Sequence, residues 1–222
     1  MIQLWKNIEQ SMSTHNRKFE IPNILSPSVK VFNGGLFHSS YSKQDIQVSN
    51  VDAEIRFRDS SFSSINLPEV KFSNMLPDEK LMIEPNVRGA IEQLLSHPEL
   101  VNKNSKEIYI TYKNRDRLKK IISCYLPDEE YCSVEEDFRK SDIIDNDIVL
   151  VGRGSFRVIT VYSVEIDEYN VPKQYLTIIL LDPYHLFLPS NHRNKSKGEI
   201  IEDTYGKVGK FGSHISKYFN FN

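Results

Sequence analysis

The sequence predicts an α+β protein. The C-terminal half is expected to form a mostly antiparallel sheet with helices on one face, and the N-terminal half to be β-rich after a first helix. The apolar run Leu176–Leu181 is typical of a central strand that is covered on both faces. Residues 86–96 and 114–125 carry apolar side chains at helical spacing, whereas 147–167 has the pattern of two strands joined near Gly152–Gly154.

Composition is that of an ordinary globular protein. Of 222 residues, 39% are hydrophobic and 26% are charged, which excludes a disordered chain. The formal net charge of −2 means that any nucleic-acid-binding surface must be local. The two cysteines are too few for a disulfide framework and match no zinc pattern, so we expect no metal or cofactor.

The same features predict where the protein works. No signal peptide or membrane-spanning run is recognisable, so the sequence predicts a cytoplasmic protein without membrane contacts. The low cysteine content agrees with a reducing compartment. Abundant Asn, Lys, Ile and Ser suggest an AT-rich genome, and hence a bacterial or phage origin.

The N-terminal half is expected to begin with an amphipathic helix over 2–18, which Pro22 closes. The turn Asn33-Gly34-Gly35 predicts a hairpin, and 51–59 alternates as a half-buried strand does. Residues 60–80 are rich in Ser and contain two prolines, so we place a candidate boundary there. The domains would be 1–80 and 81–222, or one continuous domain.

The C-terminal half continues with a helix at 86–96 and a strand at 106–113. A second helix over 114–125 has Asn114 as its cap and four residues facing inward, namely Leu118, Ile121, Ile122 and Tyr125. An acidic helix is predicted over 128–140. Past Lys195 the tail is polar and contains several glycines, and its aromatic end, Tyr218, Phe219 and Phe221, is expected to dock back onto the protein.

A group of polar side chains follows the apolar strand directly. Asp182-Pro183-Tyr184-His185 leaves the strand, and His192 and Arg193 come shortly after. Histidine suits proton transfer near neutral pH, and the arginine fork suits a phosphate. The candidate catalytic residues are Arg157, Tyr184, His185, His192 and Arg193. The alternative is structural: Asp-Pro-Tyr is an ordinary turn, His185 a half-buried residue bonded to a carbonyl, and Arg157 a solvated strand residue.

These residues also carry a resemblance to a known family. The order strand, helix, helix and three strands over 106–193, with Gly154 and Arg157 before the Tyr184-His185 cluster, is similar to the RelE/ParE superfamily of small bacterial toxins. The resemblance implies a metal-independent endoribonuclease that acts on free or ribosome-associated RNA and is bound by an antitoxin.

Two charged segments complete the candidates. Seven basic residues against two acids give 103–120 a local charge of +5, with Tyr109 and Tyr112 among them. This segment is a candidate RNA-binding face through Lys103, Lys106, Lys113, Arg115, Arg117, Lys119 and Lys120. Residues 128–147 carry −7. The two segments could simply attract each other as solvated surfaces. The alternative function is a non-catalytic interaction protein that binds a partner through 128–147 or through the β-rich N-terminal half.

Overall fold

The computed structural model describes residues 30–31, 37–38, 53–143, 156–190 and 194–220. The strands are β1 (Lys30–Val31), β2 (Phe37–His38), β3 (Glu54–Phe57), β4 (Asn66–Leu67), β5 (Phe72–Ser73), β6 (Ser105–Glu107), β7 (Phe138–Ile143), β8 (Phe156–Ile166) and β9 (Pro172–Asp182). The helices are α2 (Pro85–Ser96), α3 (Leu100–Lys103), α4 (Arg115–Ile122), α5 (Asp128–Val134) and α6 (Lys197–Val208).

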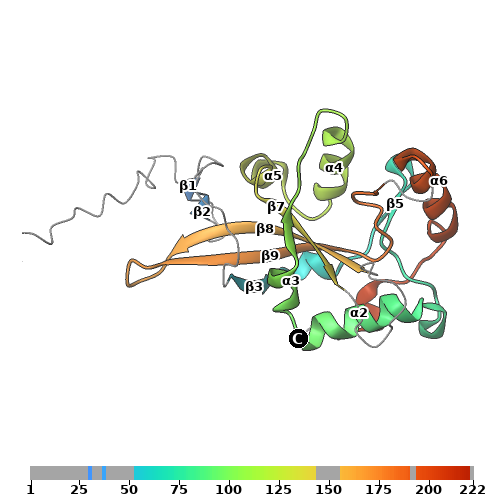
Figure 1. Cartoon of the computed structure of the whole chain (residues 1–222), viewed down its shortest axis with the longest axis horizontal. Helices are drawn as coiled ribbons and strands as arrows, with labels where there is room; N and C mark the ends of the chain where they lie inside the picture. The colour runs from blue at the N-terminus through green and yellow to red at the C-terminus, as the bar shows by residue number, and fades with distance from the viewer. Residues whose placement is uncertain (1–29, 32–36, 39–52, 144–155, 191–193, 221–222) are drawn as a thin grey trace, which may run out of the picture.

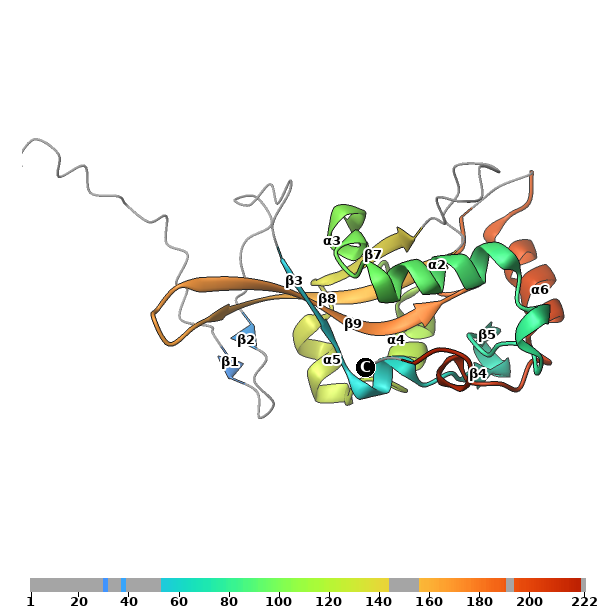
Figure 2. The same ribbon diagram turned by 90° about the horizontal axis from the view of Figure 1, so that it is seen from below.

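A five-stranded sheet organises the molecule, in the order β3-β9-β8-β7-β6. All neighbouring pairs are antiparallel except β3 and β9, which run parallel. The α+β class predicted from the sequence is therefore confirmed, as is the central place of 176–181 within β9. The β8–β9 hairpin is long, and its turn projects well beyond the helices (Figures 1 and 2).

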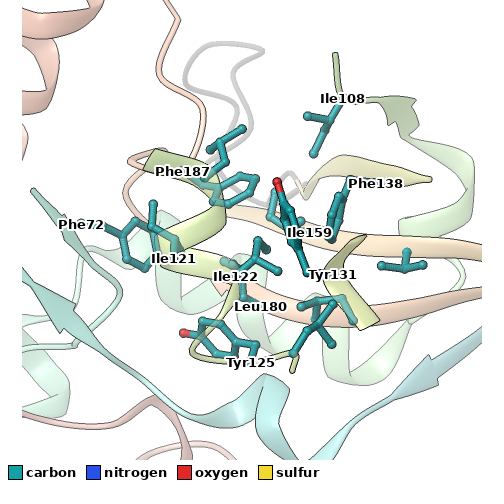
Figure 3. Close-up of a cluster of buried hydrophobic side chains, with 14 of the residues drawn as sticks. Phe72, Ile108, Ile121, Ile122, Tyr125, Tyr131, Phe138, Ile159, Leu180 and Phe187 are labelled. Atoms are coloured by element: carbon teal, nitrogen blue, oxygen red, sulfur yellow. The ribbon is translucent and has the colours of Figure 1, made fainter. Parts of the chain in front are cut away.

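Helices α4 and α5 lie together on one face of the sheet, as predicted (Figure 1). Their apolar side chains and those of the sheet form one core, part of which is drawn in Figure 3. The four predicted inward residues of α4 and its C-terminal extension are all buried: Leu118, Ile121, Ile122 and Tyr125. The prediction placed no helix on the opposite face, but α2 and α3 cover it and build a second core with residues such as Val87, Leu94 and Val101.

The acidic helix ends earlier than predicted. Helix α5 stops at Val134, and residues 138–140, which were expected to be helical, belong to β7. Phe138 and Ser141 are buried and pair with Val161 and Val158 of β8. Pairing with the long β8 strand therefore decides the conformation here, although the local charge pattern resembles that of a surface helix.

The tail contains a helix that the sequence interpretation missed. Ser196 caps α6: the Glu199 backbone N–H donates to the Ser196 hydroxyl at 3.3 Å, and the Glu199 carboxylate accepts from the Ser196 N–H at 2.8 Å. This Ser-x-x-Glu capping box is visible in the sequence and could have predicted the start of the helix. Beyond α6, the predicted docking of the end is confirmed for Phe219, which lies in the second core. Phe221 lies outside the described residues.

In the N-terminal half, the predicted hairpin is present as the antiparallel β1–β2 pair. The predicted helix 2–18 lies outside the described residues. Strand β3 pairs with β9 across the candidate boundary, so residues 54–57 share one sheet with the C-terminal half. No helix among the described residues is long and apolar enough to cross a membrane.

A β-bulge in β9 determines which side chains meet at the end of the sheet. The register between β8 and β9 shifts between Ile159 and Thr160, and Ile179 is the extra residue. Ile179 and its neighbour Leu180 consequently both pack on the α4–α5 side. The shift turns the Asp182 side chain to this same side of the sheet. Its ladder partner is Arg157 of β8.

Candidate functional site

The chain leaves β9 in a turn that Asp182 organises. The Asp182 side chain is fully buried, and its two carboxylate oxygens accept the backbone N–H groups of Leu186 at 3.0 Å and Phe187 at 2.9 Å. Arg117 of α4 holds the same turn, because its guanidinium donates to the carbonyls of Leu186 at 2.8 Å and Phe187 at 3.0 Å. The Asp-Pro-Tyr segment is thus a true turn, and Arg117 has a structural task there.

Arg157 is buried, with 3% of its surface exposed. Its Nε donates to Asp142 Oδ1 at 2.8 Å, and its Nη1 donates to the Leu188 carbonyl at 2.7 Å. This geometry fits neither the predicted phosphate ligand nor a solvated strand residue, because both require an open guanidinium. Arg157 instead fixes the 182–188 turn to β7 and contributes its charge from beneath the surface.

Positive charge accumulates around Arg157. Lys106 and Lys140 lie directly opposite each other in the β6–β7 ladder. Burial lowers the pKa of Lys140, and the charges of Arg157, Lys106 and Lys197 lower it further, against Asp142. We call Lys106, Lys140, Arg157 and Lys197 the cationic cluster. Within the described residues, Asp142 and Asp182 are the carboxylates that act on these groups, so four positive charges there face two negative ones, which makes this end of the sheet attractive to an anion.

His185 stands beside the cationic cluster. It occupies the left-handed region at φ 57°, a conformation more often found for His, Asn and Asp than for other non-glycine residues. Burial lowers the pKa of its imidazole, and Arg157 and Lys140 lower it further, against Asp182 and Asp142. The ring is therefore held neutral at neutral pH, which is the state a general base requires.

His185 and Tyr184 line a pocket of about 450 Å³ between α2, α6 and the 183–190 segment. The pocket also contains the side chains of Asn86, Thr204 and Lys207. The Tyr184 hydroxyl donates to the Met75 carbonyl at 2.8 Å, so its proton is already engaged. The predicted pair His185 and Arg157 does come together, with only His185 on the pocket wall. His192 and Arg193 lie outside the described residues.

The seven basic residues of 103–120 divide into two groups. Arg117 is engaged in the turn, and Arg115 forms two bonds of 2.6 Å with the Glu135 carboxylate. Lys119 is half-buried with its ammonium 5.8 Å from the Tyr131 ring centre. The remaining members are exposed and open to a ligand: Lys103, Lys106, Lys113 and Lys120.

Three carboxylates of the acidic segment form ion pairs within the molecule. Glu135 pairs with Arg115, Glu130 with Arg58, and Asp142 with Arg157. The expected attraction between the basic and acidic segments therefore occurs at Arg115–Glu135, and the three ion pairs together occupy carboxylates that a protein partner would need. Residues 144–147 lie outside the described residues.

The lowered pKa of His185 has a consequence for stability. The unfolded chain takes up a proton near pH 6.5, while the folded protein resists it, so the free energy of unfolding should fall as pH drops below about 6.5. Urea unfolding at about pH 7.5 and about pH 5.5 measures this. The loss should be smaller in His185→Asn, and an equal loss in both proteins would contradict the assignment.

Three residues of this site were not found by sequence reasoning: Lys140, Asp142 and Lys197. Lys140 and Asp142 alternate with Ser141 on a strand that was expected to be partly helical, which concealed their common face. Among the described residues, no group of three or more His, Cys, Asp or Glu side chains is placed to hold a metal ion. No protein-family model, curated protein or solved structure matches the chain.

Proposed function

We propose that the protein is a metal-independent endoribonuclease whose active centre is His185 beside the cationic cluster. The observation that carries the proposal is an imidazole with a lowered pKa on a pocket wall, combined with an excess of positive charge next to it among the described residues. Cleavage of RNA without a metal needs a base for the 2′-hydroxyl proton and cations for the charge of the phosphorane. The likeness to RelE/ParE toxins points the same way.

The exposure of each side chain decides the role that we assign to it in cleavage. His185 would take the proton of the 2′-hydroxyl as its oxygen attacks phosphorus. The bond to the 5′-oxygen breaks, and the departing oxygen takes a proton from solvent. Lys140 and Lys106 would hold the phosphate oxygens, and buried Arg157 would add charge without contact. The products of such an attack are a 2′,3′-cyclic phosphate and a 5′-hydroxyl.

The purified full chain should therefore cleave labelled RNA in the presence of EDTA. Lys140→Gln should slow cleavage roughly tenfold or more, since it removes a cation from the developing charge. Lys173→Gln, at the start of β9 and paired with Asp167 at 3.3 Å, is the control and should cleave as the unaltered protein does. Complete inhibition by EDTA, or equal rates for both lysine variants, would contradict the proposal.

A second candidate is an interaction protein without catalysis. One observation favours it: the turn of the β8–β9 hairpin exposes Ile166 by 48%, Tyr169 by 77% and Val171 by 51%. Apolar groups exposed together on a projecting hairpin are typical of a protein-binding surface. A protein that binds no RNA and cleaves none would favour this function.

A further inference from the structure

Two tyrosines project from the segment that joins β6 to α4. Tyr109 is 72% exposed and Tyr112 is 85% exposed. Their neighbours Ile108 and Ile110 pack against the α4–α5 core instead. The segment thus directs its isoleucines inward and its tyrosine rings outward, and the fold gains little from the position of either ring.

The backbone that carries these rings is fixed at both ends. The Ile108 N–H donates to the Phe138 carbonyl at 2.9 Å, which continues the β6–β7 pairing. The Thr111 N–H donates to Asn114 Oδ1 at 2.7 Å, and the Asn114 N–H returns a bond of 3.0 Å to the Thr111 carbonyl. A ring presented on such a segment can bind a ligand at a low cost in conformational entropy.

Positive charge accompanies the rings. The Lys113 ammonium lies 5.7 Å from the centre of the Tyr112 ring, and Lys103 and Lys106 are exposed just before Tyr109. Glu107 is the one nearby carboxylate that contacts the pair within the described residues, through a 3.3 Å bond from the Tyr109 hydroxyl. Exposed aromatic faces among lysines are the combination that binds stacked bases and their phosphates.

We propose that Tyr109 and Tyr112 form a stacking platform for single-stranded RNA. Bases would stack on the two rings while Lys103 and Lys113 contact phosphates, and Lys106, which also belongs to the cationic cluster, leads the strand toward His185. A duplex cannot use the platform because its bases are stacked on one another. The path of the RNA toward His185 rests on the proposed function. The position of the binding site rests on the exposed rings.

The test measures binding by fluorescence anisotropy in the His185→Asn background, where cleavage is not expected to interfere. The probe is a labelled single strand of about twelve nucleotides, compared with the duplex of the same sequence. Tyr112→Ala and Tyr109→Ala should each weaken single-strand binding roughly tenfold, because one stacked base is lost. Tyr112→Phe keeps the ring and should bind normally, and duplex binding should be unchanged in all variants.

Tyr169→Ala is the matched control, since the exposure of Tyr169 lies between those of Tyr109 and Tyr112 but the residue is at the far end of the β8–β9 hairpin. Equal single-strand affinity of Tyr112→Ala, Tyr109→Ala and Tyr169→Ala would overturn the platform, as would an equal loss for the duplex. The two proposals fail separately. Binding that depends on the tyrosines in a protein that cleaves nothing overturns only the proposed catalysis, whereas cleavage without that dependence overturns only the platform.

Discussion

Replacing His185 by Asn should reduce RNA cleavage by about 10²–10⁴-fold, the usual loss when a positioned base is removed. The melting temperature should hardly change. The imidazole is half-buried at the pocket wall, and asparagine tolerates the left-handed backbone at φ 57° as well as histidine does. Initial rates on labelled RNA and a thermal melt of each protein measure the two effects.

The variant His185→Gly separates chemistry from backbone strain. Glycine adopts a positive φ without steric cost. The His185→Gly protein should therefore melt no lower than His185→Asn and should still fail to cleave RNA. Expression in a bacterial host provides a second readout, in which both variants should relieve any toxicity of the unaltered protein. If both variants cleave at the normal rate, His185 is a turn residue and the catalytic proposal is wrong.

Replacing Asp182 by Ala should lower the free energy of unfolding by about 3 kcal/mol, because two buried backbone N–H groups lose their acceptors. The nearby Arg117 and Arg157 guanidiniums also lose a compensating negative charge. For a chain of this size the melting temperature should drop by about 10 °C. Urea unfolding followed by circular dichroism measures the change.

Asp203→Ala is the control for this prediction. Asp203 pairs with Lys195 on the surface, where both side chains are about half exposed, so its loss should hardly change the free energy of unfolding. Equal stability of the two alanine variants would show that the 182–188 turn does not depend on its carboxylate. Asp182→Asn retains one acceptor oxygen and should fall between the two.

The local sequence pattern alone was enough to predict the helices and strands that bury one continuous face. Helix α4 has the inward residues that its spacing predicted, and the apolar run ending at Leu181 is the central strand β9. These features need only the burial of neighbouring apolar side chains, which a single sequence reveals. The predicted segment 128–140 was only half right, because its second half gains more from pairing with β8 than from helix formation.

The candidate site was predictable in its residue types and not in their roles. The position of His185 after the strand was visible, and so was the charge of 103–120. The sequence could not show that Glu135 binds Arg115 or that two carbonyls bind Arg117. These partners lie 20 and about 70 residues away along the chain. Which cations stay open to a ligand depends on such distant contacts.

The sequence by itself therefore determined the α+β class, the central strand and a polar group at its end. Only the tertiary structure decided that Arg157 is buried and that Lys140 joins it. It also decided that Asp182 turns toward α4. The physical reason for the position of Asp182 is the bulge at Ile179: side chains of a strand alternate between the two faces, so one extra residue moves every later side chain to the other face. Without the bulge, Asp182 would lie on the α2 side with Leu176 and Ile178, away from the arginines of the turn.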